Sequence, residues 1–347
     1  MKLSFTRYDI QCTHPFGISR STHSFYRETF IYLEHNGLIG RGEASPSERY
    51  GESAEKIMSV LQNGIQLPEN IVPPEQFEAI LLPQCGDLKS LEAAFSMAYL
   101  DLWTKIEHIS LNEYFDIQTK NGPLTSFTIA MGNMDLIAQK IDEAEPYQIL
   151  KVKLGTDQDK EIIQVIRGET DKCIRVDANE GWDLSTAIEM CSWLADRNIE
   201  LIEQPLPAGK LGDTAILKKK SPLPLIADEN CLQPRDILRI AHAFDGINIK
   251  LMKCGSLLKA KQMIDMAKER EMSIMLGCMI ESSVGITAAA HLSPLVDYAD
   301  LDGNLLIKND PYIGIEISEG AIIIPRGLGL GVNLSLPESD AKSVGLK

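Results

Sequence analysis

Three hydrophobic runs of this chain each end in a carboxylate, and the carboxylates are evenly spaced. The runs read CIRVDAN, ELIEQP and LIADEN, and their acids are Asp177, Glu203 and Asp228, which are 26 and 25 residues apart. One strand and one helix fill such an interval, and the carboxyl ends of parallel strands meet at one edge of a sheet. We therefore expect the three acids to converge there. Carboxylate oxygens are hard ligands, which suit Mg²⁺ better than a soft or redox metal.

Further ionisable side chains lie at the ends of neighbouring runs. Lys151 and Lys153 are two residues apart in ILKVKLG, so both face the same side of a strand. Lys250 ends the run INIK, and Asp300 and Asp302 lie two apart in YADLDGN. Such groups at one edge could remove and return protons and neutralise charge on a substrate.

Each residue taken alone also has a plain structural interpretation. Asp228 could cap a helix beginning near Glu229, and Glu203 could simply precede the strand stop at Pro205. A lone lysine at a strand end is usually solvated, and the two aspartates could be turn residues before Gly303. Their order favours chemistry, because a lysine pair, three acids and a lysine would occupy the functional ends of consecutive strands.

Eight apolar runs alternate with helical patterns from about residue 125 onward. The runs are SFTIAMG, ILKVKLG, CIRVDAN, ELIEQP, PLIADEN, GINIKLMK, SIMLGCMIE and YADLDGN. This alternation predicts a parallel barrel over residues 121–310, whose catalytic groups would sit at the C-terminal strand ends. A doubly wound open sheet is the alternative, although no GxGxxG follows the first strand.

Residues 1–120 have a different sequence pattern, with strands first and helices after, which predicts a separate α+β domain. The segment from Ser24 to Ser45 reads as a hairpin that turns at His35-Asn36-Gly37. Apolar residues then recur on one face of a helix, at positions 91, 95, 98 and 102. Residues 311–347 return to strand and turn patterns, and we expect them to pack back on this N-terminal domain.

Composition excludes several classes of function. The net charge is −15 and no basic stripe is present, which argues against a nucleic-acid partner. The seven cysteines are scattered and include no CxxC pair, which favours a reducing compartment. No run is long enough for a membrane helix, and the N-terminus lacks an apolar signal core. We expect a cytoplasmic protein with a small-molecule substrate, able to form a homo-oligomer.

Together these motifs resemble the enolase superfamily, and within it the muconate-lactonizing-enzyme subgroup. The resemblance spans essentially the whole chain and rests on K-x-K (151–153), D-A-N (177–179), E-Q-P (203–205), A-D-E (227–229) and N-I-K-L-M-K (248–253). It implies a modified TIM barrel with an α+β capping domain. It further implies one Mg²⁺ bound by the three strand-end acids, Lys153 and Lys250 as opposed acid/base groups, and Lys151 near the substrate carboxylate.

The D-L-D motif at 300–302 is similar to that of the dipeptide epimerases. In those enzymes such a pair binds the α-ammonium group of the dipeptide, so Asp300 and Asp302 would form a cation site here. The same resemblance implies substrate contacts by Thr128 and by the backbone of Cys278. The implied reaction is epimerisation of an Ala-Xaa dipeptide at its C-terminal residue, through loss of the proton α to the carboxylate and an enediolate intermediate.

Other functions stay open at this point. Cycloisomerisation, o-succinylbenzoate synthesis and N-acylamino-acid racemisation would share the metal and lysines but give no reason for the aspartate pair. A barrel that binds a ligand without turnover would not need opposed bases. Substrate choice would depend on cap segments 14–27 and 45–53, where Arg20 could bind the side chain of an Ala-Glu dipeptide. A small apolar dipeptide, such as Ala-Ala or Ala-Val, is the other possibility.

Overall fold

A computed structural model describes residues 1–18, 21–118, 121–132 and 135–347. Eight parallel strands form its central sheet, and each lies on one of the eight predicted runs. In chain order they are β4 (Phe127–Ile129), β5 (Ile149–Lys153), β6 (Cys173–Asp177), β7 (Ile199–Glu203), β8 (Leu225–Ala227), β9 (Gly246–Ile249), β10 (Ser273–Gly277) and β11 (Tyr298–Asp300). The strands neighbour one another in chain order, which is the order of a barrel and not of a doubly wound sheet.

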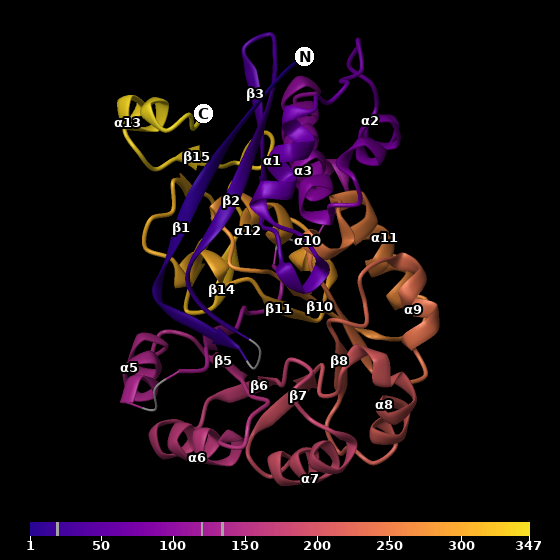
Figure 1. Ribbon diagram of the computed structural model, residues 1–347, viewed down its shortest axis with the longest axis vertical. Coiled ribbons are helices and arrows are strands. Elements are labelled where there is room, and N and C mark those ends of the chain that lie inside the picture. The colour runs from indigo at the N-terminus through magenta and orange to yellow at the C-terminus, as the bar shows by residue number, and fades with distance from the viewer. Residues whose placement is uncertain (19–20, 119–120, 133–134) are drawn as a thin grey trace.

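The sheet closes where its first and last strands meet. Thr125 forms a parallel bridge with Ala299, and the Ser126 amide donates to the Ala299 carbonyl at 3.2 Å. Helices surround the barrel (Figure 1). They are α5 (Asp135–Glu143), α6 (Asp159–Glu169), α7 (Leu184–Leu194), α8 (Leu211–Lys218), α9 (Pro234–Ile240), α10 (Leu251–Cys254), α11 (Leu257–Lys268) and α12 (Ser283–Ala290). The predicted TIM-type barrel is confirmed.

The alternation of side chains along each strand decides what the barrel encloses. On β5, Leu150 and Val152 belong to the main hydrophobic core, so Lys151 and Lys153 face the interior. Deeper in the barrel, Leu201, Ile226 and Met275 form a small apolar cluster of their own. The ionic groups of the C-terminal mouth therefore rest on an apolar layer contributed by the same strands.

The N-terminal domain is a three-stranded antiparallel sheet covered by helices. Its strands are β1 (Lys2–Ile18), β2 (Ser21–His35) and β3 (Leu38–Ala44), and the turn at Asn36-Gly37 lies where the hairpin was predicted. The helices are α1 (Ala54–Gln62), α2 (Pro74–Leu81), α3 (Lys89–Ile106) and α4 (Leu111–Tyr114). The predicted apolar face of α3 is buried against the sheet. Between β3 and α1, a short 3₁₀ helix, η1 (Glu48–Tyr50), faces the barrel mouth.

The long β1–β2 hairpin reaches from this domain to the mouth of the barrel (Figure 1). Near its tip, the Met131 amide donates to the Gly17 carbonyl at 3.0 Å. His14 Nε2 lies 2.8 Å from Glu143 Oε1 of α5. These contacts tie the hairpin to the loop and helix that follow β4.

The C-terminal stretch consists of β12 (Tyr312–Ile313), β13 (Glu316–Ser318), β14 (Ala321–Ile323), β15 (Asn333–Leu334) and α13 (Glu338–Ser343). It contacts the N-terminal sheet through a hydrogen bond of 2.7 Å between the hydroxyls of Tyr32 and Tyr312, and another of 2.7 Å from Arg41 Nε to the Lys347 carbonyl. The domain boundaries at 120 and 310 stay a prediction. Among the described residues, all seven cysteines are free and no helix has the length and apolarity to cross a membrane.

Substituting Gly42 by alanine should destabilise the protein, because α3 lies directly on β3. A Cβ at Gly42 would overlap the Ala94 carbonyl oxygen and lie 3.0 Å from the Ala98 amide nitrogen. Overpacking of this kind costs about 1–3 kcal/mol. The control is Gly212→Ala in α8, where a Cβ meets no atom within 4 Å. Urea unfolding should show a lower free energy of unfolding for Gly42→Ala alone, and equal values for both variants would contradict this packing.

Candidate active site

The three strand-end acids converge at the C-terminal mouth of the barrel. Asp177 ends β6, Glu203 ends β7 and Asp228 follows β8 directly, and each offers a carboxylate oxygen within 4.8 Å of the others. All three are almost fully buried. The chain at Glu229 forms a turn and α9 begins only at Pro234, so the interpretation of Asp228 as a helix cap is wrong.

The predicted lysines lie among these acids. Lys153 Nζ is 2.7 Å from an Asp177 oxygen, and Lys250 Nζ is 2.9 Å from an Asp228 oxygen. Lys151 Nζ lies between two of the acids, at 2.6 Å from a Glu203 oxygen and 3.2 Å from an Asp177 oxygen. Because β5 and β9 are four positions apart in an eight-stranded barrel, Lys153 and Lys250 approach the site from opposite walls.

Two functional neighbours of the acids were not singled out in the sequence. The side-chain amide of Asn248 donates to Glu203 Oε1 at 2.7 Å, and Lys253 Nζ donates to both the carboxylate and the carbonyl of Asp228. Both residues belong to the N-I-K-L-M-K motif, which was the available signal. Its spacing places Asn248 inside the barrel with Lys250, whereas Lys253 comes back to the site from α10.

The aspartates of the eighth strand are close to each other but have different partners. Asp300 accepts hydrogen bonds of 2.6 Å from Lys151 Nζ and 2.7 Å from the Ser126 hydroxyl. Asp302 accepts one of 2.6 Å from the Thr128 amide. The Cys278 thiol donates to the Asp300 carbonyl at 3.3 Å. Asp302 is thus the member of the pair with spare capacity to accept hydrogen bonds from a ligand.

The charges of the site shift the pKa values of its acids in opposite directions. Burial alone would raise the pKa of Asp177, but Lys153 and Lys151 lower it to about 2. The pKa of Asp228 lies well below its ordinary value, because Lys250 and Lys253 outweigh the effect of burial. The pKa of Glu203, in contrast, is raised by burial and by the negative charge of Asp177. Glu203 is therefore the acid whose negative charge is least compensated by the protein.

Burial and charge also act on the remaining groups. Burial opposes a charge on Lys151, yet Asp300, Glu203 and Asp177 raise its pKa well above the ordinary value. For Asp302 the charged form is disfavoured, because burial and then the charge of Asp300 raise its pKa to about 7. A cation placed beside Asp302 would lower that pKa again and hold the carboxylate ionised.

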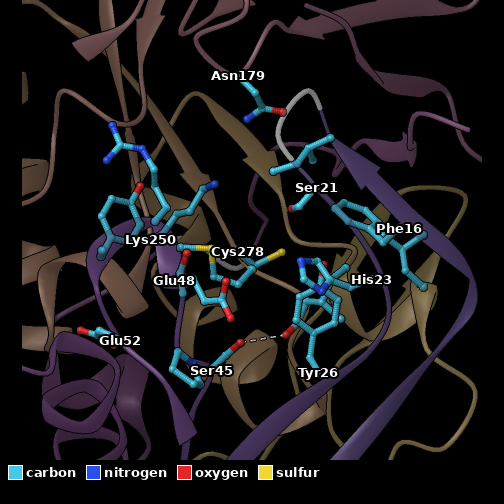
Figure 2. Close-up of a pocket in the computed structure, with 18 of the residues that line it drawn as sticks. Phe16, Ser21, His23, Tyr26, Ser45, Glu48, Glu52, Asn179, Lys250 and Cys278 are labelled. Atoms are coloured by element: carbon cyan, nitrogen blue, oxygen red, sulfur yellow. Dashed lines mark hydrogen bonds between the residues drawn. The ribbon is translucent and has the colours of Figure 1, made fainter. Parts of the chain in front are cut away.

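These side chains line a cavity of about 740 Å³ between the barrel and the cap. Both predicted cap segments contribute to it. In Figure 2, Lys250 lies on one side of Cys278, and the other side is occupied by Phe16, Ser21, His23 and Tyr26. Arg20, predicted to read the substrate side chain, lies outside the described residues.

The donor set of the three acids fits Mg²⁺. The ligand atoms are all carboxylate oxygens, which such a hard cation prefers. Glu203 Oε2 is buried, and Lys151 Nζ lies 2.6 Å from it as an ion-pair partner. Asp177, Glu203 and Asp228 would hold the ion.

The chain is similar in sequence to known epimerases. Residues 135–339 match the family model described as enolase C-terminal domain-like. The chain is 39% identical to the L-Ala-D/L-Glu epimerase of Bacteroides thetaiotaomicron over 96% of its own length and 88% of the relative. It is 35% identical to the L-Ala-D/L-amino acid epimerase of Flavobacterium johnsoniae, over 96% of its length and all of the relative.

Solved structures show the same likeness. The dipeptide epimerase of Cytophaga hutchinsonii, in complex with Mg and the dipeptide D-Ala-L-Val, superimposes with a TM-score of 0.90. The two chains are 25% identical, and the match covers 98% of this chain and 97% of the other.

Addition of Mg²⁺ to the metal-free protein should raise its Tm, because binding to the folded state alone stabilises it. A concentration 100 times the Kd should add about 2.7 kcal/mol to the free energy of unfolding. Glu203→Gln should lose most of this increase, whereas Glu200→Gln, at the other end of β7, should keep it. Differential scanning fluorimetry measures both, and a wild-type Tm that does not respond to Mg²⁺ would contradict the assigned site.

Proposed function

Because this chain belongs to the enolase C-terminal domain-like family, we propose that it is a Mg²⁺-dependent dipeptide epimerase. The substrate is a dipeptide of the Ala-Xaa class, and the reaction inverts the α-carbon of its C-terminal residue. The observation that carries this proposal is a buried Asp300–Asp302 pair beside two lysines that face one cavity from opposite walls. The aspartate pair provides a site for the ammonium group of the dipeptide, and the two opposed lysines provide for inversion of its α-carbon.

Lys153 and Lys250 carry the proton transfer. A base on one face of the substrate removes the proton α to the carboxylate, and an acid on the other face returns one. Lys153 sits beside Asp177 at 2.7 Å and Lys250 beside Asp228 at 2.9 Å, so each lysine has a fixed direction into the cavity. The lysine that acts as base must be neutral, and its opposite must be charged.

The intermediate is an enediolate that carries extra negative charge. Mg²⁺, when bound, supplies a fixed positive charge that stabilises this anion. Lys151 adds a second positive charge at the same end of the cavity, because three carboxylates hold its side chain in place and keep it an ammonium group against the effect of burial. The Lys151 charge is preorganised by its three carboxylate partners, so little reorganisation of this side chain is needed during the reaction.

The other end of the dipeptide is held by the eighth strand. The carboxylate of Asp302, supported by the Thr128 amide, accepts the α-ammonium group. Asp300 is already bonded to Lys151 and Ser126, so it adds negative charge to the ammonium site and links it to the reacting end. N-acylated substrates lack the ammonium group, which separates this proposal from an N-acylamino-acid racemase. A dipeptide library screened for deuterium incorporation in D₂O tests the proposal and identifies Xaa.

Lys250→Ala should abolish epimerisation but leave exchange of the α-proton with solvent for one stereoisomer of the dipeptide. Lys153→Ala should show the mirror-image behaviour, with exchange surviving only for the other stereoisomer. The reason is that each lysine reaches a single face of the substrate. Proton NMR in D₂O measures the exchange, and the two variants serve as controls for each other. Normal epimerisation by either variant would remove that lysine from the mechanism.

Acetylation of the dipeptide amine should remove most of kcat/KM in the wild-type enzyme. Breaking a buried ion pair by removing one partner costs about 3–5 kcal/mol. Asp302→Asn should lose activity toward the free dipeptide in the same direction but lose little more with the acetylated one, because the ion pair is already absent. Steady-state kinetics on the four combinations form a double-mutant cycle. Equal turnover of free and acetylated dipeptides by the wild type would favour the racemase or synthase alternatives.

A further inference from the structure

Three glutamates with no part in this mechanism are buried where the cap meets the barrel. Glu28 lies on β2, Glu43 on β3, and Glu281 near the end of the loop from β10 to α12. Their exposures are 0%, 0% and 1%. Within the described part of the chain, no lysine or arginine forms an ion pair with any of them. Three unpaired carboxylates in one dry seam are so costly that some must hold a proton.

The hydrogen bonds of Glu43 are those of an ionised carboxylate. Its oxygens accept from the Ser282 amide at 2.8 Å, the Ser282 hydroxyl at 2.6 Å and the Gly285 amide at 2.8 Å. Ser282 is the N-cap of α12, so a residue of the cap domain satisfies amides in the first turn of a barrel helix. Negative charge is stabilised at that end of a helix.

The contacts of Glu281 are those of a carboxylic acid. Its Oε1 accepts from the Met279 amide at 2.7 Å, which leaves Oε2 to carry a proton. That Oε2 faces Gly285 together with Glu43 Oε2, since a Cβ at Gly285 would overlap the first oxygen and lie 3.1 Å from the second. Because the two oxygens face the same glycine, a proton on Glu281 Oε2 would remove the repulsion between two neighbouring negative charges.

Glu28 is also best described as neutral. The single hydroxyl proton of Ser45 has two acceptors in reach, the Ile280 carbonyl at 3.0 Å and Glu28 Oε1 at 3.1 Å. When Ser45 donates to Ile280, Glu28 must donate to Ser45, which requires a protonated acid. The other oxygen of Glu28 is buried and has no hydrogen bond at all.

The charges around the seam agree with this distribution of protons. Burial raises the pKa of Glu43 to about 7, with Asp310 adding to the effect and the donors from Ser282 and Gly285 opposing it. Burial and then Glu43 raise the pKa of Glu281 to about 8, and the Met279 amide and Lys250 oppose this effect. Burial, Glu43 and Glu281 raise the pKa of Glu28 well above its ordinary value.

We propose that protonated Glu281 and ionised Glu43 are positioning residues that hold the Cys278–Ile280 loop against the substrate. This inference rests on the proposed epimerase function, because the loop lines the substrate cavity. Glu281 fixes the loop through the Met279 amide, and Glu43 fixes the helix start that follows it. Through Ser45, the same seam also holds the Ile280 carbonyl. The cap domain thus covers the mouth of the barrel and also holds, through Glu43 and Ser45, the loop and helix start that follow β10.

The test compares Glu281→Gln with Glu281→Leu. Glutamine can accept from Met279 and donate toward Glu43 as the protonated acid does, whereas leucine can do neither. Relative to Glu281→Gln, Glu281→Leu should raise KM for the dipeptide about tenfold or more, because small displacements of positioning groups are costly. Equal KM values for the two variants would overturn the positioning role. Glu78→Leu is the matched control, because Glu78 accepts from the Ser256 hydroxyl and has no part in the seam, and it should leave KM near the wild-type value.

A second readout does not depend on catalysis. An acid whose pKa is higher in the folded state loses stability as pH rises, here between its ordinary value of 4.5 and about 8. The Tm of Glu281→Gln minus that of the wild type should therefore grow by at least about 3 °C from pH 5 to pH 8. Glu316→Gln, at an exposed position, should show a constant difference. A constant difference for Glu281→Gln would overturn the protonated state, whereas absence of any dipeptide turnover in the wild type would instead refute the proposed function.

Discussion

The structure depends on one electrostatic constraint, which is that acids and lysines must neutralise one another inside a dry barrel. Asp177, Glu203 and Asp228 could not be buried together, with carboxylate oxygens within 4.8 Å of one another, without cations nearby. Lys151 meets this need at the centre of the group, and the apolar layer below excludes water from it. The same charges that make the site possible to fold also prepare it to hold a cation and to stabilise an anion.

The barrel and its acids were predictable because strand ends repeat along the sequence. Each acid follows a short apolar run, and parallel strands bring such ends to one edge whatever the helices between them contain. The division of labour between Asp300 and Asp302 was not predictable. It arises because Lys151, six strands earlier in the chain and one strand beyond the closure of the barrel, reaches Asp300 and not Asp302.

The contacts of Glu43 and Lys253 were hidden for a different reason. The partners of Glu43 are Ser282 and Gly285, which lie 239 and 242 residues later in the chain. The local sequence GRGEAS contains no pattern that predicts these contacts. Lys253 lies on a short helix whose direction decides whether the side chain points to solvent or back to Asp228. Local sequence patterns indicate which face of a helix or strand is apolar. The partners of Glu43 depend instead on how the two domains pack, and those of Lys253 depend on the orientation of α10.

The closure of the barrel has a consequence for the order in which the molecule is made. Thr128 and Asp302, which we propose as the ammonium end of the site, are 174 residues apart in the chain and meet where β4 and β11 complete the circle. Contacts between such distant segments carry a large loop-closure entropy and form late in folding. During synthesis, Asp302 also leaves the ribosome after every metal ligand. If the proposed roles hold, the lysines of the site leave the ribosome before the aspartate proposed to select a dipeptide, and a newly made chain acquires its specificity last.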